Sequence, residues 1–180
     1  ASTFNEVLTV SAAIDAAESD DEKLALIESQ LSDACQIICD IYSRYLFESA
    51  VFAARPEEFL DPDRLCQMML EAQKKAYGDG LDQTCLHPYM WLCKGHYYSG
   101  SLSFYNFPYA FGGLFARGLY AKYQQEGKDF VPLYKKMLHA TSVTCVEDTA
   151  KIAGIDLTDK AFWRQGLQSL ADETDLFCQL

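Results

Sequence analysis

The sequence predicts an all-α protein, and three observations support this. Apolar residues recur every three or four positions along most of the 180 residues, which is the period of an amphipathic helix. Helix start and stop signals, such as Asp61-Pro62 and Gly78, bound these stretches. No convincing run of alternating apolar and polar residues indicates a β-strand. We therefore expect a single, multi-helix domain over residues 1–180.

Two helices are predicted in the first half of the chain. The first runs from Asp21 to about Ala53 and has cap and first-turn acidic residues at positions 19–22. Its expected buried face comprises Leu24, Ile27, Leu31, Cys35, Ile38, Tyr42, Tyr45, Leu46 and Phe52. The second has Asp61 as its N-cap and Pro62 as its first residue, and it ends at Gly78.

Four helices are predicted in the second half of the chain. They are expected from near Pro108 to Gly127, from Asp129 to about Ala140, from Thr144 to just before Gly154, and from Thr158 or Asp159 onward. Thr144 and Glu147 have the spacing of a capping box, in which each side chain bonds the main chain of the other.

The net charge of −11 comes from the first third of the chain. Residues 1–63 contain 14 acidic and 3 basic residues, whereas acids and bases balance over residues 64–180. Nucleic acids and anionic membrane surfaces are bound through clustered lysine and arginine, which this sequence lacks. No apolar stretch approaches the ~20 residues of a membrane span. We therefore expect neither nucleic acid nor membrane as a main partner.

The seven cysteines are an odd number and include no CxxC pair. Neither a zinc ribbon nor a thioredoxin-like redox motif is therefore predicted. In so apolar a chain, most cysteines are expected to be buried free thiols that behave as small hydrophobic residues. This usage favours a reducing cytoplasm.

The candidate site is the glycine-rich, aromatic loop from about Gly78 to Phe107, which does not fit a helical pattern and is long for a compact domain. Tyr105 and Tyr109 are four residues apart at the entry of the next helix, so their hydroxyls are expected on one side. Together with His96, they could donate hydrogen bonds to an oxyanion or a peptide carbonyl. Core packing of the same residues is the simpler alternative.

Other catalytic arrangements are not indicated. The sequence has no HExxH, no GxSxG and no glycine loop for phosphate. His87, His96 and His139 fit no familiar metal-ligand spacing, and no cysteine stands out as a nucleophile to pair with His96. We therefore predict no metal site made by this chain alone.

Three blocks of the sequence carry a resemblance: Ala1–Glu6; His87–Trp91 with His96–Tyr98 and Phe104–Gly112; and Ala153–Asp159 with Phe162, Trp163, Gly166 and Leu167. In this order they resemble oligoendopeptidase F-like zinc peptidases of the thimet-oligopeptidase family. The blocks are similar to the helix after the third zinc ligand, the substrate-binding loop and the C-terminal tail of that family. The resemblance covers essentially the whole chain.

The resemblance implies the C-terminal helical portion of a zinc-dependent oligoendopeptidase that hydrolyses short peptides. In this family an HExxH helix and a downstream glutamate hold the zinc, and the glutamate of HExxH acts as general base. Carried over to this chain, His96, Tyr105 and Tyr109 would bind substrate and stabilise the oxyanion. Tyr98 would be a weaker substrate-binding candidate.

The zinc ligands implied by the family would lie upstream of Ala1, with the glutamate two residues before it. The chain alone is therefore expected to bind no catalytic zinc and to cleave nothing. Its implied partner is the missing N-terminal part of the same polypeptide, and we expect the isolated piece to self-associate through apolar faces left bare. Residues 139–143 depart from the family, which usually has a small, glycine-containing turn there.

Two other functions remain open from the sequence. A free-standing helical module could use the aromatic loop to hold a peptide without chemistry, or an all-α scaffold could simply pack the loop in its core. An HExxH and a glutamate just before Ala1 would favour the peptidase over both.

Overall fold

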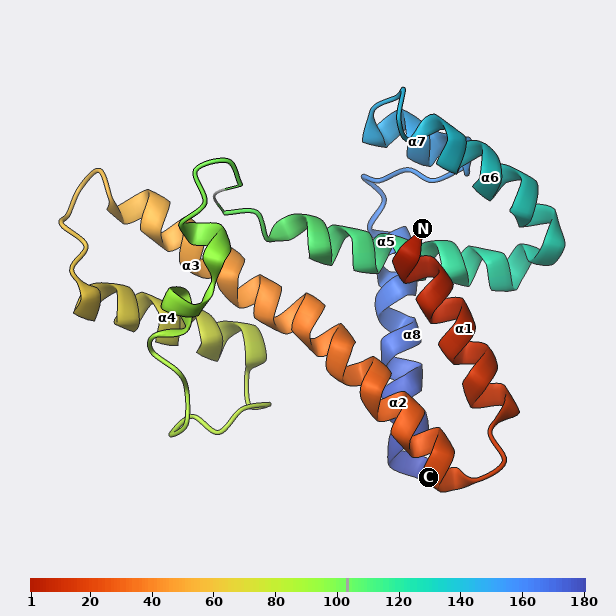
Figure 1. The fold of residues 1–180 in the computed structure, drawn as a ribbon, viewed down its shortest axis with the longest axis horizontal. Coiled ribbons are helices and arrows are strands. Elements are labelled where there is room, and N and C mark those ends of the chain that lie inside the picture. The colour runs from red at the N-terminus through yellow and green to blue at the C-terminus, as the bar shows by residue number, and fades with distance from the viewer. Residues whose placement is uncertain (103) are drawn as a thin grey trace. The chain divides into compact units, whose positions relative to one another are not determined.

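The computed structural model describes residues 1–102 and 104–180, and most of them are helical (Figure 1). No strand occurs within these ranges, so the all-α prediction is confirmed. The α-helices are α1 (Ser2–Ala16), α2 (Asp20–Cys35), α3 (Ile41–Ala54), α4 (Pro62–Tyr77), α5 (Phe107–Glu126), α6 (Phe130–Ala140), α7 (Val146–Ile152) and α8 (Lys160–Gln179). None of the described helices is long and apolar enough to cross a bilayer.

The chain divides into two compact units. The first unit contains residues 1–32 and 112–180, and the second contains residues 33–111. The boundaries fall inside α2 and α5. Each unit has a buried core of its own.

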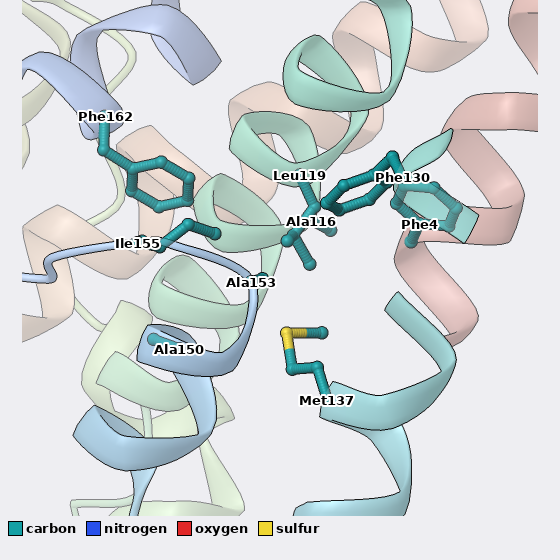
Figure 2. Packing of buried hydrophobic residues seen from close by; sticks show 9 residues of the cluster. All are labelled: Phe4, Ala116, Leu119, Phe130, Met137, Ala150, Ala153, Ile155 and Phe162. Carbon is teal, nitrogen blue, oxygen red and sulfur yellow. The ribbon is translucent and has the colours of Figure 1, made fainter. Parts of the chain in front are cut away.

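The first unit is built around an apolar cluster from α1, α5, α6, α7 and α8 and from the connection after α7 (Figure 2). Its buried members are Phe4, Ala116, Leu119, Phe130, Met137, Ala150, Ala153, Ile155 and Phe162. Phe130 is fully buried, and Phe4 stacks on Tyr134 with ring centroids 4.5 Å apart. Removing these side chains from water is the main stabilising contribution in this unit.

Two glycines let α5 and α8 approach closely within the first unit. A Cβ atom on Gly118 would lie 2.5 Å from the ring of Phe162, and one on Gly166 would lie 3.0 Å from a main-chain oxygen of α5. The same helices are joined by Arg117, which is buried and donates from Nη1 to Glu173 Oε1 at 2.9 Å. Small residues and one ion pair therefore fix this helix pair.

The second unit is built on α3 and α4, which pack against each other (Figure 1). Its apolar core is small and consists of Phe47, Met68, Met69 and Ala72. The long connection after α4 contains two short 3₁₀ helices, Met90–Cys93 and Gly95–Tyr97, and packs Met90, Trp91 and Tyr97 against this core. The loop is thus partly anchored by apolar contacts.

Gln73 of α4 fixes the same loop through hydrogen bonds. Its side chain is 4% exposed, its Nε2 donates to the main-chain oxygen of His87 at 2.9 Å, and its Oε1 accepts from the main-chain nitrogen of His87 at 3.3 Å. A buried amide that satisfies both main-chain groups of one loop residue holds that residue against the helix.

Several predicted helix boundaries are confirmed. Asp61 is the N-cap of α4 and accepts from the main-chain nitrogen of Arg64 at 2.8 Å, with Pro62 as the first helical residue. Asp159 caps α8 by accepting from the main-chain nitrogen of Ala161 at 2.8 Å. These signals are local, so they could be read without knowledge of tertiary contacts.

The predicted capping box of Thr144 and Glu147 is wrong. Helix α7 has Cys145 as its N-cap and no side-chain cap bond. Both the main-chain nitrogen and the hydroxyl of Thr144 donate instead to the main-chain oxygen of Ala140, at 3.0 and 2.9 Å. The hydroxyl thus bonds back to the end of α6, and its contact with α7 is with the Thr149 hydroxyl at 2.7 Å and not with a main-chain nitrogen of the first turn.

The helix predicted from Asp21 to about Ala53 is present as α2 and α3, but it buries a different face in its second part. A π-helical turn, Gln36–Asp40, joins the two helices. Three aromatic side chains expected to be buried are exposed: Tyr42, Tyr45 and Phe52. Three charged side chains are buried: Asp40, Arg44 and Glu48. The extra residue of a π turn rotates the following helix face relative to the apolar pattern.

The prediction that most cysteines are buried is also wrong. All seven are free thiols, but five are exposed and two are intermediate. Their positions give the reason, since Cys85 lies in the long loop, Cys145 caps a helix and Cys178 ends one. Such positions lie outside the faces that pack in either core.

Candidate functional site

His96, Tyr105 and Tyr109 lie together in the second unit. Their ring centroids are 6.2 Å apart for His96 and Tyr105, 6.0 Å for His96 and Tyr109, and 6.0 Å for the two tyrosines. Tyr105 is 40% exposed, Tyr109 is 46% exposed and His96 is half-buried. The three polar aromatic rings therefore form one cluster that keeps part of its surface accessible. We refer to them as the donor cluster.

A main-chain hydrogen bond between Phe104 and His96 brings Tyr105 next to His96. The main-chain nitrogen of Phe104 donates to the main-chain oxygen of His96 at 3.0 Å, and Phe104 has a φ of +57°. This left-handed conformation is disfavoured for a residue with a large side chain. It is held because the Phe104 ring packs against Phe52 and Tyr97, with centroids 4.7 and 5.5 Å away.

Asn106, which lies between the two tyrosines in the sequence, anchors the start of α5. Asn106 is fully buried, and its Oδ1 accepts from Arg44 Nη1 at 3.1 Å, while its Nδ2 donates to Glu48 Oε1. Its main-chain oxygen accepts from the main-chain nitrogen of Tyr109 at 3.1 Å. A single buried amide therefore links both tyrosines to two charged side chains of α3.

A second link ties the His96 segment to the same helix face. Asp40 Oδ2 accepts from Arg44 Nη2 and also from Lys94 Nζ at 3.4 Å, and Lys94 lies two residues before His96. The side chains Asp40, Arg44, Glu48, Lys94 and Asn106 thus form one polar network. Because it bonds both segments that carry the donor cluster, the network sets the spacing of the three rings.

The polar network contains a carboxyl group whose charge depends on pH near neutrality. Burial raises the pKa of Glu48 to about 7, against the opposing effects of the hydrogen bond from Asn106 and the charge of Arg44. Burial, with a smaller contribution from Glu48, also raises the pKa of Tyr97, so that this phenol stays protonated. The network therefore gains negative charge as the pH rises through 7.

Tyr98, the weaker sequence candidate, has a different setting from the donor cluster. It is 59% exposed, and its hydroxyl donates to the main-chain oxygen of Trp91 at 3.3 Å. Partial burial, and to a smaller extent the nearby Cys93, raise its pKa above the ordinary value. The side chain is thus bonded within its own loop.

The polar network was missed in the sequence, although one signal could have indicated it. Asp40, Arg44 and Glu48 follow one another at intervals of four residues, which places alternating charges on one helix face. Such a pattern usually indicates a solvated surface. Only the tertiary contacts of Asn106 and Lys94 show that this face is buried.

The described residues do not fit a zinc ion by themselves. No group of three or more histidine, cysteine, aspartate or glutamate side chains suited to hold a metal is found among residues 1–102 and 104–180.

The fold and the donor cluster define an all-α protein with clustered hydrogen-bond donors on an aromatic loop. Comparison of the chain with protein-family models, curated proteins and solved structures found no match.

Proposed function

We propose that this chain forms the substrate-binding wall of a zinc-dependent oligoendopeptidase that hydrolyses short peptides. The observation that supports the proposal best is the mutual approach of His96, Tyr105 and Tyr109, whose rings lie 6.0 to 6.2 Å from one another. These are the positions to which the family resemblance assigns substrate binding and oxyanion stabilisation. Rings dispersed into separate cores would have argued against it.

The donor cluster suits a peptide carbonyl. The two phenols carry O–H donors and the imidazole carries an N–H donor. When a nucleophile attacks a peptide bond, its carbonyl oxygen gains negative charge, and donors already in position stabilise that charge without reorganising. The polar network behind the cluster supplies this rigidity, because Asn106 attaches one donor segment to α3 and Lys94 attaches the other to the π-helical turn before α3.

In this proposal, the catalytic zinc is bound by residues upstream of Ala1, namely an HExxH helix and a glutamate. Zinc bound there would activate the attacking water. The exposed Phe52, Phe59 and Phe107 are candidates for the surface that meets that upstream part. The mostly exposed free thiols agree with a reducing cytoplasm as its compartment.

The test uses the native polypeptide that carries this sequence. Its residues before Ala1 are determined, its zinc content is measured, and hydrolysis of a quenched fluorescent peptide is followed. Tyr105→Phe and Tyr109→Phe remove one donor each, and each is expected to lower kcat by about 10- to 1,000-fold with zinc content unchanged.

Tyr45→Phe is the matched control, because Tyr45 is an exposed tyrosine of the same unit outside the donor cluster, and its kcat should match the wild type. Peptide binding without hydrolysis would show a binding module instead of a peptidase. Unchanged kcat in both donor variants would remove the donor cluster from the mechanism.

A further inference from the structure

A cavity of about 290 Å³ opens beside the donor cluster, and nothing in the proposed function assigns it a role. It lies within the second unit and is lined by Gln36, Ile37, Ile41, Arg44, His96 and Tyr109. Two of these, His96 and Tyr109, are donor-cluster residues with rings 6.0 Å apart. When the donor cluster binds one group of a ligand, the adjoining part of the same ligand therefore lies next to this cavity.

The π-helical turn shapes the other side of the cavity. The main-chain nitrogen of Ile41 bonds the main-chain oxygen of Gln36, five residues earlier, in place of the usual four. The extra residue brings Gln36 and Ile37 to the cavity together with Ile41 of the next turn. Single π turns inside α-helices are frequent at functional sites for this reason.

The lining favours an uncharged apolar occupant. Ile37 and Ile41 contribute aliphatic surface, and Ile41 is 6% exposed. Arg44 brings a permanent positive charge to the lining, and this charge is already paired with Asp40 and bonded to Asn106. A carboxylate would compete with Asp40 for that guanidinium, and an ammonium group would be repelled by it. An apolar side chain faces neither penalty.

The volume favours a large side chain. A cavity of about 150 Å³ lined by apolar residues is enough to bind benzene. At about 290 Å³, this cavity has room for an isobutyl or benzyl group and for some water at its opening. An alanine methyl group would leave most of it unfilled and would gain little from burial.

We propose that this cavity is the pocket for one large apolar side chain, such as that of leucine or phenylalanine, in the short peptide that the donor cluster holds. The inference rests on the proposed function and adds the side-chain preference to it. Ile37 and Ile41 are then specificity-determining residues, and Gln36 stands at the opening, where its side chain is exposed.

The experiment measures kcat/KM of the native polypeptide for a series of quenched peptides. A test residue (Ala, Leu, Phe, Asp or Lys) is placed in turn at each position around the cleaved bond. At one position, Leu and Phe are expected to exceed Ala by about 10-fold or more, and Asp and Lys are expected to give no gain over Ala.

Gln36→Trp closes the opening of the pocket and should reduce the preference for Leu and Phe to within about 2-fold of Ala. Gln67→Trp is the matched control, since Gln67 is an exposed glutamine on α4 and should keep the preference. Circular dichroism checks that both variants fold.

The outcomes separate the pocket from the proposed function. Hydrolysis that depends on Tyr105 and Tyr109 but not on the test residue would overturn the pocket and leave the proposed function standing. A preference for Asp would overturn it too, because Arg44 would then recognise the substrate as a charge. A preference that survives Gln36→Trp would place the apolar pocket elsewhere. No hydrolysis of any peptide would overturn both proposals.

Discussion

The two units of this protein differ in the balance of apolar and polar residues that they bury. The first unit closes around nine apolar side chains and brings α5 and α8 together through Gly118 and Gly166. The second has a small apolar core and buries Asp40, Arg44, Glu48, Gln73 and Asn106 as well. An apolar core fails when volume is added or lost, whereas a buried polar network fails when one partner is removed. The two units should therefore respond to different substitutions.

The difference also bears on the proposed function, because the donor cluster lies in the unit with the polar network. Apolar packing is tolerant of small rotations, but hydrogen bonds between buried groups restrict both distance and angle. The network in the second unit bonds the segments on which His96, Tyr105 and Tyr109 lie. The unit thus gives up apolar burial where the position of donors matters.

The two tryptophans make the comparison measurable. Trp91 lies in the second unit and Trp163 in the first. Replacing either one with phenylalanine leaves a single fluorescent reporter for the other unit. The free energy of urea unfolding of one unit is then measured for a substituted protein and compared with that of its single-tryptophan parent.

The largest effect is expected for Arg44→Met in the second unit. The substitution keeps the length of the side chain but removes the guanidinium group. This group pairs with Asp40, donates a hydrogen bond to Asn106 and lowers the pKa of Glu48 through its charge. Asp40 keeps Lys94 and Glu48 keeps Asn106, but the buried ion pair of Asp40 with Arg44 is broken, and breaking such a pair costs about 3–5 kcal/mol of unfolding free energy. The loss should be seen with the Trp91 reporter.

Arg55→Met is the control for that substitution, because Arg55 is an exposed arginine just after α3. It should change the unfolding free energy by less than about 0.5 kcal/mol. Equal, small effects of the two substitutions would mean that the polar network does not stabilise the second unit, and the contrast between the units would be lost.

An intermediate effect is expected for Gly118→Ala in the first unit. The added methyl group would lie 2.5 Å from the Phe162 ring, so the ring or the two helices must shift. Overpacking of this kind costs about 2 kcal/mol, read with the Trp163 reporter.

Gly112→Ala is its matched control, since it lies on the same helix and its methyl group would meet no described atom within 4 Å. There, the better helix propensity of alanine should raise the unfolding free energy by about 0.5–1 kcal/mol. Stabilisation by both substitutions would show that close approach of α5 and α8 is not required.

The smallest effect is expected for the pH dependence of Glu48→Gln. The pKa of Glu48 is about 7 in the folded protein and 4.5 without its surroundings, so the folded state holds the proton between these values. Rising pH through this range therefore lowers the unfolding free energy. Because solvent near the cluster screens part of the shift, the contribution is about 1 kcal/mol.

Urea unfolding of the second unit at pH 5 and pH 8 checks this. The loss of stability from pH 5 to pH 8 should be about 1 kcal/mol smaller in Glu48→Gln than in the wild type. The same pH dependence in both proteins would mean that Glu48 is ionised at pH 5, and that burial does not control its charge.

Much of the helical framework could be predicted from local sequence, and the cores could not. Asp61 and Asp159 cap their helices as expected, because a cap needs only the residues next to it. The buried face of α3 was mispredicted, because the apolar period favoured Tyr42, Tyr45 and Phe52 and gave no sign of the π-helical turn. The capping box at Thr144 was mispredicted for another reason. Its hydroxyl can bond either the end of α6 or the start of α7, both of which are close in sequence, and it bonds Ala140 at the end of α6.

The candidate site divides in the same way. The nature of its donors, one imidazole and two phenols, and the four-residue spacing of Tyr105 and Tyr109 follow from the amino acids and the helix period alone. The approach of His96 to both tyrosines, the burial of Asn106 and the cavity beside them depend on bonds between residues as far as 62 positions apart. Local sequence determines which conformations a segment prefers. Only tertiary structure decides which groups lose water and which partners they then require.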